Sequence, residues 1–113
     1  MRIAVPYYNG NINPAFGKSE YFKLYDTEDG KILSTAVIDN GGNEHTGLIT
    51  HLKNNDVDVA LVGNIGQHGV DAFAEAGIEL YTSNYDDADS VVKQYLDGTL
   101  ELKREAKGCS IAG

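Results

Sequence analysis

The sequence has one cysteine, two prolines and no tryptophan among its 113 residues. A single thiol, Cys109, cannot form a disulfide within the chain, so the fold must rest on its hydrophobic core, and we expect it to need no metal for folding. Because disulfides mark oxidising compartments, we also expect a cytoplasmic protein. The apolar run at residues 3–5 ends at Pro6, which is too short for a signal peptide or a membrane span, so no membrane partner is expected.

Basic residues are also few, since nine Lys and Arg stand against 17 Asp and Glu for a net charge of -8. The longest basic run is Lys103-Arg104. Nucleic-acid binding depends on clustered lysines and arginines that displace counterions from phosphates. The composition therefore indicates a protein that does not bind nucleic acid.

The first half of the chain predicts three strands and one long loop. Residues 2–6 are apolar on both sides, as expected for a central strand covered on two faces. Residues 20–26 and 32–39 are rich in aromatic and β-branched side chains, and Asp29-Gly30 between them favours a hairpin turn. Residues 7–19 contain many turn formers and are too long for an idle connection, so we predict a functional loop there.

The second half of the chain follows a helical hydrophobic period between short apolar strands. The spacing i, i+3, i+4, i+7 from His45 to Leu52 predicts a helix with His45 on its core-facing stripe. Residues 57–62 and 78–82 predict buried parallel strands, and 99–102 a short edge strand. The three predicted helices end near Asn55, at Gly77 and just before Gly98.

Together these elements predict an α/β fold in the order β-β-β-α-β-α-β-α, with a mixed five-stranded sheet and helices on both faces. The arrangement is similar to the ribonuclease-H-like fold. We expect one domain over residues 1–104 and a flexible tail over 105–113. Loops 7–19, 40–45, 63–67 and 83–86 should meet at one sheet edge, where open α/β sheets usually bind ligands. The expected core contains seven large apolar side chains: Val5, Val37, Leu52, Leu61, Phe73, Leu80 and Val92.

Three histidines are the first candidates for chemistry. His45 falls at the predicted ligand edge, either as a metal ligand or as a residue that only packs against the loop. His68, in the first turn of the second helix, is predicted to face away from the core. The simpler interpretation is an exposed side chain without a role. His51 lies mid-helix, away from the edge, and is interpreted as structural.

Other patterns carry weaker signals. The turn Gly63-Asn64-Ile65-Gly66 follows a buried strand and enters a helix, so its amides can hold an anion, or the glycines serve only a tight turn. Cys109 has no neighbouring ligand partner and is interpreted as a free thiol. The acids Asp86, Asp87 and Asp89 lie at a helix start, where the dipole favours them without catalysis.

The sequence predicts no enzyme. It has no Ser/His/Asp arrangement, no Walker loop and no zinc-ligand spacing. A nuclease of ribonuclease-H-like fold needs several metal-binding acids, one of them on the first strand, and residues 2–6 contain none.

Four ordered motifs resemble a known family: the N-terminal 1–6 segment, Phe16-Gly17 with its following strand, His45-Thr46-Gly47, and Gly63-Asn64-Ile65-Gly66. The chain is similar over residues 1–102 to the dinitrogenase iron-molybdenum cofactor accessory proteins. This resemblance implies a ribonuclease-H-like fold and a non-catalytic protein that binds or carries the iron-molybdenum cofactor, an iron-sulfur precursor or a related metal cluster. It also implies a nitrogenase-assembly or related protein as partner.

The resemblance implies the site residues as well. His45 would be the metal ligand, and the other cofactor-binding residues would be Phe16, Gly17, Gly63, Asn64, Gly66 and His68. Members of the family commonly have a histidine before Phe-Gly, where this chain has Ala15. The alternative hypothesis is a regulatory or protein-interaction module that binds a small anion at the same edge without metal.

Overall fold

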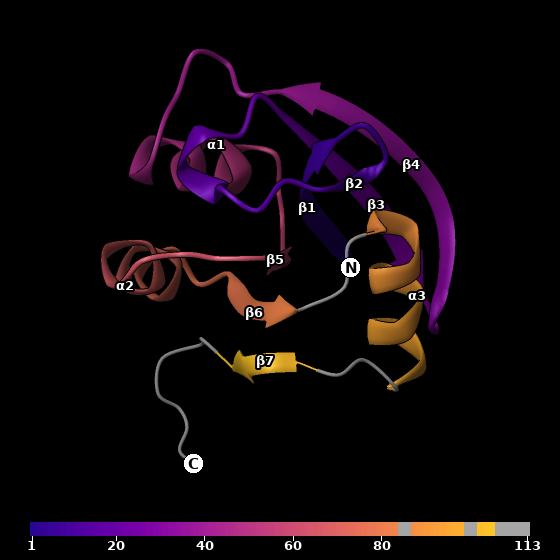
Figure 1. Ribbon diagram of the computed structural model, residues 1–113. Helices are drawn as coiled ribbons and strands as arrows, with labels where there is room; N and C mark the ends of the chain where they lie inside the picture. Colours follow the sequence, from indigo (N-terminus) through magenta and orange to yellow (C-terminus); the bar gives the residue numbers. More distant parts are fainter. Residues whose placement is uncertain (84–86, 99–101, 106–113) are drawn as a thin grey trace.

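A computed structural model describes residues 1–83, 87–98 and 102–105, the last four by their backbone (Figure 1). The elements in chain order are β1 (Arg2–Tyr8), β2 (Asn11–Ile12), the 3-10 helix η1 (Phe16–Lys18), β3 (Tyr21–Glu28), β4 (Lys31–Asp39), α1 (Thr46–Asn54), β5 (Val59–Val62), α2 (Gln67–Ala76), β6 (Glu79–Ser83), α3 (Ala88–Asp97) and β7 (Leu102–Glu105). Helices and strands alternate from β4 onward. The predicted α/β class is confirmed. In the described part of the chain no helix has the length and apolar character to cross a membrane.

The sheet is mixed, with strand order β4-β3-β1-β5-β6-β7, and the short β2 pairs with β1. β1 runs antiparallel to β3 and parallel to β5, so the first strand is central, as predicted. The predicted count of five strands is wrong because β2 and β7 also join the sheet. β7 begins at Leu102, where the predicted edge strand ended, and it includes Glu105. Residues 106–113 of the predicted tail lie outside the described residues.

Helices cover both faces of the sheet, as predicted. On one face α1 and α2 pack side chains such as Leu48, Leu52 and Phe73 against the sheet. On the other face α3 contributes Val91 and Val92 to a second cluster. Figure 1 shows α1 and α2 together on one side of the strands and α3 on the other.

The local turn predictions are confirmed. The β3–β4 hairpin turns at Asp29 and Gly30, which both have positive φ angles, 54° and 77°, as a two-residue hairpin loop with right-handed twist requires. Helix α2 ends at Gly77 and α3 at Gly98, each in the left-handed conformation.

The prediction that Val37 belongs to the core is wrong. Six of the seven predicted side chains are at most 1% exposed, but Val37 is 50% exposed. Val37 lies on β4, the outermost strand, whereas α3 packs against β1, two strands away. The apolar content of β4 predicts a strand, but only the position of β4 at the edge of the sheet explains why Val37 stays exposed.

Candidate functional site

The predicted functional loop 7–19 is more ordered than a plain loop, because it contains β2 and η1. Phe16 anchors it: the side chain is 3% exposed, and its ring centroid lies 5.4 Å from that of Phe73 and 5.9 Å from that of Phe22. At the next turn, Ser19 is buried, and its carbonyl accepts a hydrogen bond from the Asn40 side chain at 3.1 Å. These contacts fix the loop over the ends of α1 and α2.

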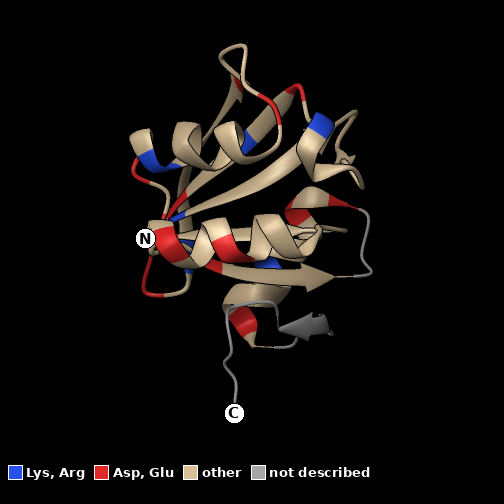
Figure 2. Ribbon diagram, turned by 90° about the vertical axis from the view of Figure 1, so that its left-hand side faces the viewer, with Lys and Arg blue, Asp and Glu red and all other residues tan. Residues whose placement is uncertain are grey.

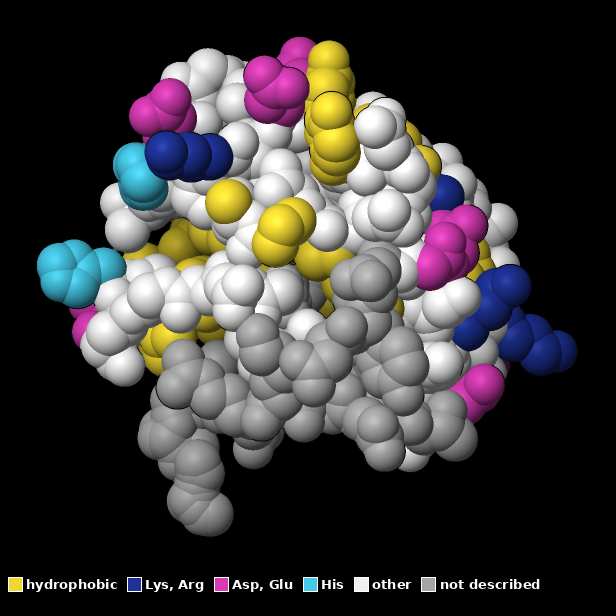
Figure 3. Space-filling view, viewed as in Figure 1, with side chains coloured by type: hydrophobic (Ala, Val, Ile, Leu, Met, Phe, Trp, Pro, Cys, Tyr) yellow, Lys and Arg dark blue, Asp and Glu magenta, His cyan; other side chains and the backbone are white. Residues whose placement is uncertain are grey.

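Three of the four loops predicted to meet do so, around a cleft of about 620 Å³. The cleft lies between the η1 loop, the start of α1 and the β5–α2 turn, and Figure 3 shows histidine side chains at the margin of a hollow on this side of the molecule. Its lining residues are Pro14, Ala15, Phe16, Gly17, Lys18, His45, Thr46, Asn64, Ile65, Gly66, His68 and Gly69. The volume is in the range of small-molecule sites. Of the fourth loop, residues 84–86 lie outside the described residues.

His45 lies in the cleft, but the predicted core-facing position is wrong. The helix begins one residue later, so His45 is the exposed N-cap of α1, with φ 53° and ψ -125°. These angles are unfavourable for any residue with a Cβ atom: they cost about 1 to 3 kcal/mol and persist only where the surrounding structure imposes them. The His45 amide donates to the Gly17 carbonyl at 3.0 Å, which holds this backbone in place.

The His45 ring lies directly against Gly17. A Cβ atom at residue 17 would be 2.7 Å from His45 Nδ1, closer than real Cβ contacts. Glycine at this position therefore makes room for the imidazole. Strained backbone that tertiary contacts enforce clusters at functional sites, so this geometry supports His45 as a functional residue.

The cleft differs in charge from the rest of the protein. None of its described lining residues is acidic, although the chain has 17 Asp and Glu, and Lys18 adds a positive charge. Figure 2 shows acidic residues spread over several other elements. The N-caps of α1 and α2, His45 and Gly66, both lack a side-chain capping hydrogen bond, so two positive helix ends open on one cleft. This arrangement suits an anionic ligand.

Most of the predicted site residues gather in this cleft. Asn64, Gly66 and His68 line it, and the backbone of Asn64 forms a parallel bridge to Ala15. Gly63 is not among the lining residues: a Cβ there would lie 3.3 Å from the Pro14 Cα, so its small size serves packing.

His51, interpreted as structural, does not line the cleft. Its Nε2 lies 2.9 Å from the Asp39 carbonyl, which ties α1 to the end of β4.

Sequence reasoning missed Lys18 and Ile65 as cleft residues. Lys18 had a usable signal, because it is the one charged residue in segment 7–19. Ile65 had none: its side chain lies over Gly69, and a Cβ atom at residue 69 would be 2.6 Å from it, a contact that depends on the turn geometry.

The described residues contain no group of three or more His, Cys, Asp or Glu side chains placed to hold a metal ion. A bare ion would therefore find fewer than three such ligands together among the described residues, whereas a preassembled cluster brings its own inorganic ligands and needs few from the protein. The acids at the start of α3 are structural where described: Asp87 caps the Ser90 amide at 2.8 Å, and Asp89 pairs with Lys23. Asp86 and Cys109 lie outside the described residues.

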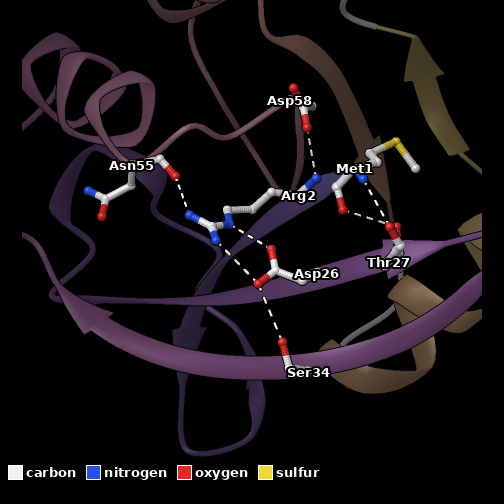
Figure 4. A network of polar contacts seen from close by, with 7 residues as sticks. All are labelled: Met1, Arg2, Asp26, Thr27, Ser34, Asn55 and Asp58. Atoms are coloured by element: carbon white, nitrogen blue, oxygen red, sulfur yellow. Dashed lines mark hydrogen bonds and ion pairs between the residues drawn. The ribbon is translucent and has the colours of Figure 1, made fainter.

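A polar network lies at the opposite end of β1 from the cleft (Figure 4). Arg2 Nε donates to Asp26 Oδ1 at 2.7 Å, and a second guanidinium nitrogen donates to the Asn55 carbonyl at 2.7 Å, just past the end of α1. The Arg2 amide also donates to Asp58 at 2.8 Å. The hydrogen bond from Arg2 holds the pKa of Asp26 below its ordinary value. The network joins β1 and β3 to the segment that follows α1.

We expect Asp26→Asn to weaken the dependence of stability on acid pH. A lowered carboxyl pKa stabilises the fold above the unfolded-state pKa of about 3.9, and this contribution is lost as the pH falls below that value and through the lower folded-state pKa. Because the Asp26 side chain is 43% exposed, solvent screening limits its contribution to about 1 kcal/mol or less. Urea unfolding at neutral pH and near pH 3 measures the difference. Asp97→Asn, at an exposed acid without an ion pair among the described residues, is the control, and equal pH dependence in both variants would contradict the prediction.

The chain is similar in sequence and in structure to several known proteins. Residues 1–98 match a family model described as "Dinitrogenase iron-molybdenum cofactor". An uncharacterized protein of Methanocaldococcus jannaschii, MJ0580, is 32% identical over 106 residues, which cover 89% of this chain and 90% of that protein. The crystal structure of PH0822 has a TM-score of 0.85 at 27% identity and covers 96% of this chain and 99% of its own.

A further solved structure shares the fold. The apo form of the orange protein from Desulfovibrio gigas has a TM-score of 0.74 at 24% identity, with 92% of this chain and 93% of that chain covered. The similarity therefore extends over nearly the whole length of each protein and includes every element that lines the cleft.

Proposed function

Because the chain belongs to the dinitrogenase iron-molybdenum cofactor family, we propose that it is a non-catalytic binding or carrier protein for a metal cluster. The cargo is the iron-molybdenum cofactor, an iron-sulfur precursor or a related anionic cluster, and it is delivered to a nitrogenase-assembly or related protein in the cytoplasm. The ribonuclease-H-like classification of the fold belongs to the same proposal.

The observation that carries the proposal is the composition of the cleft. In a chain of net charge -8, it gathers two imidazoles, a lysine and two uncapped helix N-termini, with no acid among its described lining residues. Metal-sulfur clusters are anionic, amide N–H groups stabilise them, and imidazole is a suitable donor to iron. The charge and the donor set of the cleft therefore both fit such a cargo.

The predicted site residues that line the cleft have distinct roles in this proposal. His45, whose backbone amide is bound by the Gly17 carbonyl at the start of α1, supplies the metal ligand. His68 on α2 supplies a second contact. Asn64 and the amides near Gly66 hold the outer atoms of the cluster. The Phe16 ring packs against Phe73 of α2 and so holds the η1 loop in place.

Anaerobic reconstitution with iron and sulfide tests the proposal. A bound cluster gives visible charge-transfer absorption, and we expect His45→Ala to reduce it most, by about tenfold or more in affinity, because a metal ligand is lost. His68→Ala should reduce it less. His51→Ala, on the same helix as His45 but outside the cleft, is the matched control and should leave it unchanged.

Two results would contradict the proposal: no absorption in the wild-type protein, or equal losses in the His45 and His51 variants. The alternative, a regulatory or interaction module for a small anion, is favoured by the lack of a three-ligand metal group among the described residues. It predicts that a colourless oxyanion such as molybdate binds to the cleft, that Lys18→Ala weakens this binding, and that iron and sulfide give no colour.

A further inference from the structure

Gly69 is an unusual residue for its place in the fold. It lies in the first turn of α2, where its amide donates to the Gly66 carbonyl at 3.1 Å, and it is not among the glycines with a positive φ. Inside a helix glycine is less favourable than alanine, because its unfolded chain has more conformational freedom to lose. The backbone does not require glycine here, so the reason for it lies in what a side chain would meet.

A side chain at residue 69 would collide with Ile65. A Cβ atom there would be 2.6 Å from both Cγ1 and Cδ1 of Ile65, closer than real Cβ contacts. Among the described residues no other side chain lies within 4 Å of that position. Both residues line the cleft. Gly69 therefore makes room for the Ile65 side chain to lie on the first turn of α2.

Without this room the Ile65 side chain would have to turn into the cleft. Ile65 packs on one side against the core cluster that contains Phe16, Val70 and Phe73. Protein interiors are close-packed, so that side has no space for a displaced side chain. The open space beside Ile65 is the cleft itself. A Cβ atom at residue 69 would therefore rotate Ile65 into the cleft and narrow it.

The cleft has a second glycine of the same kind. At Gly17 a Cβ atom would be 2.7 Å from His45 Nδ1, and both of these residues also line the cleft. Two side chains from different segments, His45 at the start of α1 and Ile65 in the β5–α2 turn, thus each lie on a glycine of this one cavity. The repetition supports a role in the cleft beyond the local packing of α2.

We propose that Ile65, held back on Gly69, sets the size of the anion that the cleft admits, so that these two residues determine specificity. The inference rests on the proposed function, because it concerns the ligand of the same cleft. His45, His68 and Lys18 supply the hydrogen-bond donors and, at the lysine, the positive charge that select an anion. Ile65 has neither, so it acts through its shape and limits the ligand to one that fits the volume of about 620 Å³.

A double-mutant cycle with two probes of different size tests the proposal. The larger probe is the cluster formed from iron and sulfide, and the smaller one is molybdate, a single tetrahedral ion. Gly69→Ala should weaken cluster binding about tenfold or more, because added side-chain volume in a fitted pocket costs at least this much, and it should weaken molybdate binding less. In the Ile65→Ala background the same change should have no effect, since alanine has no Cγ or Cδ atom to displace.

Two measurements separate this effect from a loss of folding. Gly69→Ala should melt within a few degrees of the wild type, because alanine favours the helix. Ala74→Gly is the matched control: it exchanges the same two residue types at an exposed position of α2 outside the cleft, and it should leave the affinity for both probes unchanged.

Methyl NMR of the ligand-free protein reports the rotamer of Ile65 directly, and we expect it to change in Gly69→Ala. An unchanged rotamer, equal losses for the two probes, or a loss that persists in the Ile65→Ala background would each overturn the inference. A wild-type protein that gives no colour with iron and sulfide contradicts the proposed function instead. The Ile65 rotamer and the molybdate titration of the same variants then decide the inference.

Discussion

Replacing Phe16 by alanine should cost about 3 to 5 kcal/mol of folding free energy, a large part of the stability of a domain of this size. Phe16 is 3% exposed and packs its ring against both Phe22 and Phe73, so its removal leaves a cavity under the η1 loop. Without this anchor the loop loses its position beside His45, and we expect ligand affinity to fall as well. Urea unfolding and reconstitution under folding conditions measure the two effects.

Two controls separate the loss of stability from the loss of the site. Leu61→Ala removes a fully buried side chain on the opposite face of the sheet and should cost about 2 to 5 kcal/mol while leaving affinity intact. Phe16→Leu keeps most of the volume and should lose little of either. If Leu61→Ala reduced affinity as much as Phe16→Ala, the anchoring role of Phe16 would be wrong.

The second large effect concerns His45, where two substitutions should separate stability from binding. His45→Ala and His45→Gly both remove the imidazole, so both should bind the cluster more weakly to the same extent. They differ in backbone strain, because alanine keeps a Cβ atom at φ 53° and glycine does not. We expect His45→Gly to be more stable than His45→Ala by about 1 kcal/mol.

Thermal melting without ligand compares the two variants directly, and reconstitution measures whether their affinities fall equally. The matched site for comparison is Asp56, another residue with a Cβ atom and a positive φ, 61°, but outside the cleft. Asp56→Gly should be more stable than Asp56→Ala in the same way, with no effect on affinity. Equal stability of the two His45 variants would show that the surrounding structure does not impose strain at this residue.

Sequence patterns predicted the elements whose causes are local. Asp29-Gly30 specifies its hairpin through two positive φ angles, and Gly77 and Gly98 end their helices in the left-handed conformation. The nearly continuous apolar run in 57–62 predicted a buried parallel strand, and all four residues of β5, which lies within it, are buried. In each case the residues of the element and its immediate neighbours are enough to explain why the element forms.

The wrong predictions depend on contacts between distant segments. Helical spacing placed His45 on the core-facing stripe because it counts positions, and it cannot register the hydrogen bond to Gly17 that holds His45 outside the helix. Val37 has the composition of a core residue, but its exposure follows from the position of β4 in the sheet. Lys18 becomes a cleft residue only when the η1 loop folds onto α1 and α2.

The central position of β1 also affects how the protein emerges from the ribosome. The first 39 residues contain β1, β3 and β4, a set of three adjacent strands that can pair as soon as they are exposed. The other side of β1 must wait for β5, which begins only at Val59. At about 5 to 20 residues per second, the nascent chain presents an open, apolar strand edge for about one to four seconds. During that interval the open edge of β1 is available for wrong pairing and for chaperones.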